Sequence, residues 1–136
     1  DLVPAVLYEL GLSTALKSIS NQLDNMADLH SEAHIDADLP PIDKKKELAI
    51  YRIVQESVNN AIKHADATQI DIHLTQENGI VIAKVIDNGS GIADDKKDLA
   101  GLGLSSMRER AAAFSGSVHL ESGSTQGTTV LLNLPI

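Results

Sequence analysis

Two apolar segments joined by Asn78-Gly79 constrain the fold of this chain more than any other feature. In residues 69–76, apolar side chains alternate with polar ones, which is typical of a strand with one buried face. The segment "IVIAKVID" that follows is apolar almost throughout and reads as a core strand. Asn-Gly between two such segments favours a tight two-residue turn. The sequence therefore predicts a β-hairpin here.

Two other segments have the apolar periodicity of helices. One runs from about Val6 to Leu29 and the other from Lys44 to Ala65. Between them, a short strand is expected near residues 30–36, followed by a loop, because Pro40-Pro41 cannot lie inside a helix or a central strand. The positions expected to face the core are Leu7, Leu10, Ala15, Ile19, Leu23 and Met26 in the first helix, and Tyr51, Val54, Val58, Ile62 and Ala65 in the second.

The last third of the chain is expected to add one helix and two strands. Ser106 and Glu109 have the spacing of a capping box and Gly116 suits a helix end, so a helix is expected over about 105–115. Strands are expected near 117–122 and 128–134. The order of elements favours an α+β fold, a two-layer sandwich with a mixed sheet of about five strands and three helices, preceded by an N-terminal helix.

Composition excludes several classes of protein. A net charge of -8 argues against a nucleic-acid-binding surface, although not against a bound nucleotide. The absence of cysteine excludes disulfides and cysteine-based zinc sites. No segment approaches the roughly 18 apolar residues of a membrane span, and no signal peptide is visible. Because the chain begins in helical phase without an initiator Met, we interpret it as a fragment of a longer protein.

The second helix carries a polar face opposite its apolar stripe. At about 100° per residue, Glu56, Asn60, Lys63 and His64 project within roughly one third of the circumference. Glu56 and Asn60 are one turn apart, so oxygen atoms of both side chains can approach one cation or one reacting group. A solvated polar face would give the same pattern.

The hairpin ends in an acid that is followed by closely spaced glycines. A buried carboxylate is costly without a partner, so Asp87 is either a solvated turn residue or is held there to meet a ligand. Gly89, Gly91, Gly101 and Gly103 allow close approach to the backbone, and the last pair precedes a helix start, where N–H groups favour phosphate. Hairpin loops also use such glycines. Neither a P-loop nor a Rossmann motif is present.

A third motif, Gly127-Thr128, opens a strand that can lie beside the Asp87 strand, although a tight turn is the simpler interpretation. Together and in this order, the motifs resemble those of the ATP-binding catalytic domain of bacterial sensor histidine kinases, in the wider group of gyrase, mismatch-repair and chaperone ATPases. The resemblance covers about residues 42–136. "QESVNNAIKHA" and "GLGLSSMRERAAAFSG" resemble the nitrate-sensor type, whose partners are LuxR-type response regulators.

The resemblance implies a Bergerat-type ATP-binding fold and two domains. The opening "LVPAVLYELGLSTAL" is similar to the end of the second helix of the dimerisation and phosphoacceptor domain. Residues 1–29 are therefore expected to belong to that helix, and residues 30–136 to the catalytic domain. The parent protein is expected to be a homodimeric kinase anchored in the membrane with this part in the cytoplasm. The fragment itself is expected to be a monomer without contact to membrane or nucleic acid.

The resemblance also implies a role for each candidate residue. Asp87 would accept a hydrogen bond from the adenine amino group, together with Thr128, while Glu56 would polarise or deprotonate the incoming histidine. Asn60 would bind the Mg²⁺ that bridges the phosphates. The remaining residues expected to contact the nucleotide are Lys63 and His64, which could neutralise phosphate charge, Gly89 and Gly91 beside the adenine, and Gly101, Gly103 and Leu104 beside the phosphates.

The implied reaction is transfer of the γ-phosphoryl group of Mg-ATP to a histidine. In this family the accepting histidine is followed by an acid, and none of the five histidines here is. The fragment is therefore expected to bind ATP without phosphorylating itself. Two alternatives stay open: an anti-sigma-factor-type serine kinase, and a non-catalytic module whose interactions depend on nucleotide.

Overall fold

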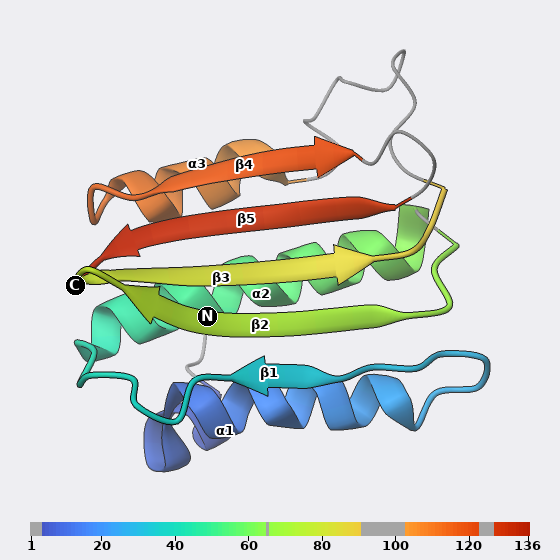
Figure 1. Cartoon of the computed structure of the whole chain (residues 1–136), viewed down its shortest axis with the longest axis horizontal. Coiled ribbons are helices and arrows are strands. Elements are labelled where there is room, and N and C mark those ends of the chain that lie inside the picture. Colours follow the sequence, from blue (N-terminus) through green and yellow to red (C-terminus); the bar gives the residue numbers. More distant parts are fainter. Residues whose placement is uncertain (1–3, 65, 91–102, 123–126) are drawn as a thin grey trace.

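The computed structural model describes residues 4–64, 66–90, 103–122 and 127–136. The described strands form one mixed sheet in the order β1-β2-β3-β5-β4, in which β1 is parallel to β2 and all other neighbours are antiparallel. The elements are α1 (Ala5–Asp24), β1 (Ala33–Ile35), α2 (Lys44–His64), β2 (Ile70–Glu77), β3 (Ile80–Asp87), α3 (Leu104–Ala112), β4 (Ser117–Ser122) and β5 (Thr128–Pro135). The five strands and three helices of the described ranges, with α1 as the N-terminal helix, confirm the predicted α+β sandwich (Figure 1).

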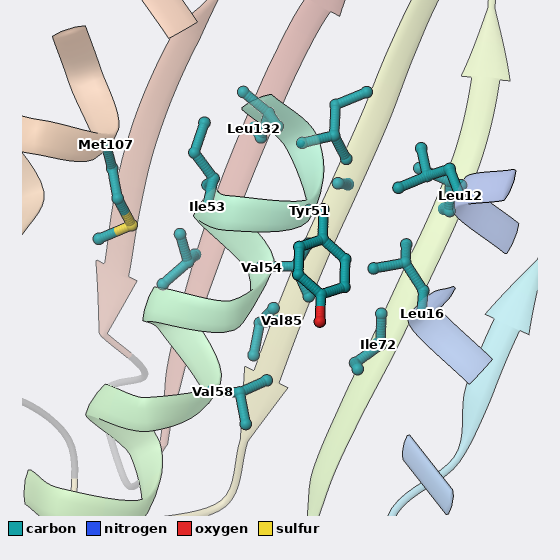
Figure 2. Close-up of a cluster of buried hydrophobic side chains, with 14 of the residues drawn as sticks. Leu12, Leu16, Tyr51, Ile53, Val54, Val58, Ile72, Val85, Met107 and Leu132 are labelled. Atoms are coloured by element: carbon teal, nitrogen blue, oxygen red, sulfur yellow. The ribbon is translucent and has the colours of Figure 1, made fainter. Parts of the chain in front are cut away.

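One hydrophobic core lies between the sheet and the helices. Along β3, β5 and the first six residues of β2, every second residue is buried, which is the pattern of a sheet covered on one face. Figure 2 shows Leu12 and Leu16 of α1, Val54 of α2 and Met107 of α3 directed toward the strands. All three helices thus contribute side chains to the same core. None of the helices in the described ranges is long and apolar enough to cross a membrane.

The predicted hairpin is confirmed. β2 and β3 pair in register from Ile70 opposite Asp87 to Glu77 opposite Ile80. Asn78 and Gly79 both have positive φ angles, 52° and 77°, as a tight turn that follows the twist of the strands requires. The backbone N–H of Ile136 donates to the Gly79 carbonyl at 3.0 Å, so the end of the chain lies beside this turn.

The first helix differs from its predicted form in length and at two of its predicted core positions. It ends at Asp24 instead of Leu29, and Gly11 interrupts it with φ 87° and ψ 174°. The predicted core positions Leu7, Ala15 and Leu23 are buried on both sides of this break. Leu10 is 64% exposed and Met26 lies beyond the helix at 46%, whereas Leu12 and Leu16 are buried in the core.

The second helix has nearly the predicted bounds, but its apolar stripe was wrong at one of the four described positions, since Ala65 lies outside the described residues. Tyr51, Val54 and Val58 are buried as expected, while Ile62 is 42% exposed and Ala61 is buried in its place. Two successive steps of four residues, from Val54 to Ile62, rotate the side chain by about 80° around the helix. A step of four followed by one of three returns the side chain to the sheet.

The third helix begins two residues before the predicted cap. Gly103, with φ 66°, precedes Leu104, and no side chain caps the helix, so the predicted capping box of Ser106 with Glu109 was wrong. At the other end, Ser115 is the left-handed residue, with φ 61°. Its N–H donates to the Ala112 carbonyl at 3.0 Å, which is one of the bonds that close a helix in this way.

Gly116 follows the helix end as predicted, but the left-handed conformation is adopted by Ser115, and glycine is required at Gly116 for lack of space. A Cβ atom on Gly116 would lie 2.5 Å from the Asn133 carbonyl oxygen of β5. The close approach of the chain to β5 therefore excludes a side chain at this position.

Candidate functional site

The candidate residues gather at one end of the sandwich. Figure 1 shows the C-terminal ends of α2 and β3 at the same end of the molecule as the first residues of α3 and β5. The fold therefore brings together four segments that are far apart in the chain. The predicted residues located there are Glu56, Asn60 and Lys63 on α2, Asp87 and Gly89 at the end of β3, Gly103 and Leu104 at the start of α3, and Thr128 at the start of β5.

Asp87 ends β3 and lies between two neighbouring strands. It pairs with Ile70 of β2 on one side and with Thr128 of β5 on the other. Asp87 and Thr128 are each only 8% exposed. The backbone N–H of Gly89 donates to Asp87 Oδ1 at 2.8 Å, which fixes the direction of the carboxylate.

Burial dominates the electrostatics of this carboxylate. Loss of water around Asp87 raises its pKa above the ordinary value of 3.8, and the backbone N–H groups of Gly89 and Thr128 only partly oppose that shift. The charged form is thus less favourable here than in water. A ligand that donates a further hydrogen bond would stabilise the carboxylate, which suits a binding role.

Gly127 packs directly against the turn that follows Asp87. It has φ 95°, and its N–H donates to the Gly89 carbonyl at 2.8 Å. A Cβ atom at this position would lie 2.5 Å from the Asp87 carbonyl oxygen. The glycine of the Gly-Thr motif therefore supports the Asp87 turn, a role that the sequence alone did not reveal.

Asn88 is a residue that the sequence analysis missed. Its Oδ1 accepts hydrogen bonds from the backbone N–H groups of Thr68 and Gln69, both at 2.9 Å, and its Nδ2 donates to Thr68 Oγ1 at 2.8 Å. Asparagine next to a strand end often bonds to backbone N–H groups. That tendency is visible in the sequence, but the partners lie about twenty residues earlier in the chain, and only the fold identifies them.

Glu56 lies against the first residue before α3. It is half-buried, and a Cβ atom on Gly103 would lie 2.5 Å from Glu56 Oε1. One residue further along α2, the buried Ser57 donates to the Ile53 carbonyl at 2.7 Å and contacts Met107 Sδ of α3 at 3.5 Å. The two helices are therefore in contact beside the candidate general base.

The other predicted residues differ in how far the structure describes them. Asn60 is half-buried and Lys63 is exposed on the last turns of α2. The Leu104 side chain is 1% exposed and lies in the core, so only its backbone could contact a ligand. Gly91 and Gly101 lie outside the described residues, and for His64 only the backbone position at the end of α2 is described.

In the described part of the chain, no three acidic or histidine side chains come together as a metal site. A protein-only metal centre is therefore not formed by these residues. Asn60 offers one amide oxygen, a hard ligand of the kind that Mg²⁺ accepts, and Mg²⁺ usually takes its other ligands from phosphates and water. The donor set thus fits a magnesium ion that arrives with its nucleotide.

Comparison with known proteins identifies the family. Residues 45–136 match the model of the family described as "Histidine kinase-, DNA gyrase B-, and HSP90-like ATPase". The chain is 36% identical over its whole length to the oxygen sensor histidine kinase NreB of Staphylococcus carnosus, of which it spans 40%.

Solved structures show the same fold. The histidine kinase domain of the Erythrobacter litoralis EL346 blue-light activated histidine kinase matches with a TM-score of 0.76 at 20% identity, over 91% of this chain and 60% of that one. Full-length ShkA, solved in complex with AMPPNP, matches with a TM-score of 0.71 at 24% identity, over 99% of this chain and 31% of that one. The resemblance seen in the motifs is thereby confirmed. Because the family model matches more than half of its residues, the chain belongs to the histidine kinase-, DNA gyrase B- and HSP90-like ATPases.

Proposed function

We propose that this chain is the ATP-binding catalytic domain of a two-component sensor histidine kinase. The observation that carries the proposal is the buried Asp87 carboxylate, which is held by the Gly89 N–H and placed beside Thr128 at the end of the sheet. A buried carboxylate can accept a hydrogen bond from the amino group of a purine, which would offset the cost of its burial. The AMPPNP bound to the related ShkA supports ATP as the nucleotide.

The proposed site extends from the purine to the phosphates along α2. Asp87 and Thr128 recognise the adenine, Gly89 leaves space beside the ring, and Gly91 is assigned the same task. Asn60 provides an oxygen ligand to Mg²⁺, which when bound neutralises phosphate charge. Lys63 and His64 are assigned to the phosphates, as are the backbone groups of Gly101, Gly103 and Leu104.

The proposed reaction moves the γ-phosphoryl group of ATP to a histidine nitrogen of a separate phosphoacceptor domain. The bond between the γ-phosphorus and the bridging oxygen breaks, ADP leaves with that oxygen, and a phosphorus–nitrogen bond forms. Glu56 receives a hydrogen bond from the other nitrogen of the imidazole or removes its proton, which makes the attacking nitrogen more nucleophilic. Glu56 lies beside Gly103, and its neighbour Ser57 contacts Met107 of α3.

The remaining parts of the proposal concern the parent protein. Residues 1–29 are assigned to the end of the second dimerisation helix and residues 30–136 to the catalytic domain. The parent is proposed to be a membrane-anchored homodimer whose catalytic domain lies in the cytoplasm, and which passes phosphate to a LuxR-type response regulator.

Calorimetric titration with ATP and Mg²⁺ tests the nucleotide site. Wild-type protein is expected to bind, and Asp87→Asn is expected to lower the affinity at least tenfold, because the amide is uncharged and replaces one of the two acceptor oxygens by an NH₂ donor. Asn21→Ala, which changes an exposed residue of α1, is the matched control. Equal heats from the wild-type protein and Asp87→Asn would remove the site assignment.

A second variant separates catalysis from binding. Glu56→Ala is expected to keep its affinity for Mg-ATP but to lower phosphoryl transfer to a supplied phosphoacceptor domain by about a hundredfold or more. If transfer continues at the wild-type rate, Glu56 is not the base, and a non-catalytic nucleotide-dependent module becomes the better interpretation. Transfer to a serine of a partner protein would instead indicate the serine-kinase alternative.

A further inference from the structure

We infer that Asn88 is a positioning residue of the nucleotide site, which joins the turn carrying Asp87 to the segment that follows α2. The inference rests on the proposed function and assigns to Asn88 a task that does not involve contact with ATP. Its basis is a set of four hydrogen bonds made by this single residue.

All four hydrogen bonds lead to Thr68 and Gln69, directly before β2. Asn88 Oδ1 accepts from both backbone N–H groups at 2.9 Å, and Nδ2 donates to Thr68 Oγ1 at 2.8 Å. The backbone N–H of Asn88 donates to the Gln69 carbonyl at 3.2 Å. Because Asn88 uses both ends of its amide in this way, its side chain has one defined orientation even at an exposed position.

The position of Asn88 in the chain makes this orientation important for Asp87. Asn88 lies between Asp87 and Gly89, the residue whose N–H holds the carboxylate. On the opposite side, the N–H of Gly127 donates to the Gly89 carbonyl at 2.8 Å. The turn is therefore held from the β2 side by Asn88 and from the β5 side by Gly127.

The same bonds connect the two ends of the proposed nucleotide site. Thr68 and Gln69 are only a few residues beyond the end of α2, the helix that carries Asn60 and Lys63. By fixing these two residues against the Asp87 turn, Asn88 sets the purine-binding carboxylate relative to the phosphate-binding end of α2. Loss of the bonds would allow the two ends to move independently and would weaken binding of a ligand that spans them.

Two substitutions test this inference. Asn88→Ala removes all three side-chain bonds, whereas Asn88→Asp keeps an oxygen that accepts from both N–H groups and loses only the donation to Thr68. In calorimetric titration with ADP and Mg²⁺ at physiological ionic strength, where the added charge is partly screened, Asn88→Ala is expected to bind at least tenfold more weakly than the wild-type protein. Asn88→Asp is expected to stay within about threefold, and Asn21→Ala is the control.

Amide hydrogen exchange of Gly89 in the nucleotide-free protein provides a readout that does not depend on binding. In Asn88→Ala this amide is expected to exchange at least tenfold faster, because its bond to Asp87 opens when the turn is released. Amides in the centre of β3 should keep their protection, which shows that the variant is folded.

The two measurements separate the possible failures. Unchanged Gly89 exchange in Asn88→Ala, or an affinity within threefold of wild type, overturns the positioning role, as does an Asn88→Asp variant as weak as Asn88→Ala. If the wild-type protein binds no ADP, the proposed function fails, and the exchange measurement alone decides whether Asn88 holds the Asp87 turn.

Discussion

Asp87 lies almost fully buried at the end of β3, and burial raises the pKa of its carboxyl group. In the protein without a ligand, an ionised Asp87 therefore gives a lower free energy of unfolding than an uncharged residue would. The sign follows from proton linkage: the folded state keeps its proton to higher pH than the unfolded state, so stability falls as pH rises from about 3.8 through the raised pKa.

The consequence can be measured without nucleotide. Asp87→Asn cannot ionise, so it is expected to be more stable than the wild-type protein near neutral pH, with a difference that disappears below about pH 4. Thermal unfolding of both proteins across this pH range checks the prediction. A difference between them that does not change with pH would show that the buried charge is not its cause.

Gly103 controls the space available to Glu56. A Cβ atom there would lie 2.5 Å from Glu56 Oε1, so Gly103→Ala is expected to displace the carboxylate and to lower phosphoryl transfer by about tenfold or more, with a smaller change in ATP affinity. The positive φ adds a stability cost of about 1 kcal/mol. Transfer rates and calorimetric affinities measured side by side test this separation.

Gly79→Ala is the matched control for this substitution. Gly79 also has a positive φ, 77°, but a Cβ atom added there, at the far end of the sheet, would meet nothing within 4 Å. It should therefore show a similar loss of stability with normal phosphoryl transfer. If both variants lose transfer equally, the effect is one of general stability and not of Glu56.

Candidate site residues could be predicted from the sequence where they stand in short motifs. The contacts that support them could not be predicted. Asp87 and its glycines stand in one motif, and Glu56 and Asn60 are one helical turn apart, so both groups could be found in the sequence. The contact of Gly127 with Asp87 joins residues forty positions apart. The bonds of Asn88 likewise depend on how β2 and β3 are paired.

Elements with a strong local signal were predicted well, and errors arose where a helix is interrupted, where its stripe was counted past the buried face, and where it starts without a side-chain cap. The hairpin has an alternating strand and an Asn-Gly turn, and the structure reproduces it residue by residue. In α1, by contrast, the pattern was counted through Gly11, where the backbone leaves the helical conformation. In α3, Gly103 is the N-cap residue and has no side chain that could accept a capping hydrogen bond. A sequence pattern of side-chain caps therefore does not locate this helix start.

Packing of α1 into the core leads to a stability prediction with a control in the same helix. Leu16 is 0% exposed, so Leu16→Ala is expected to lower the free energy of unfolding by about 2–5 kcal/mol. Leu10, although an apolar neighbour in the sequence, is 64% exposed, and Leu10→Ala should change it by less than about 0.5 kcal/mol. Chemical denaturation of the two variants checks the difference, and equal losses would contradict the packing of this helix.

The chain contains candidate catalytic residues but no histidine of the kind expected to accept the phosphoryl group. None of its five histidines is followed by an acid, so the isolated chain is expected to bind ATP and to gain no stable phosphoryl label. It should also sediment as a monomer at micromolar concentration. Incubation with labelled Mg-ATP, with and without a separate phosphoacceptor domain, checks the first expectation, and analytical ultracentrifugation checks the second. Label on the chain alone would mean that another residue serves as acceptor.

The turn at Asn78 and Gly79 lies at the opposite end of β3 from Asp87 (Figure 1). Eight strand residues at about 3.3 Å each separate the two ends by about 25 Å. Because the sequence contains no cysteine, a single Glu77→Cys would accept a fluorescent dye at one defined place. Such a dye would not contact a nucleotide bound at the Asp87 end. It would still lie within range for energy transfer to a fluorescent ATP analogue, so that fluorescence would report occupancy of the site.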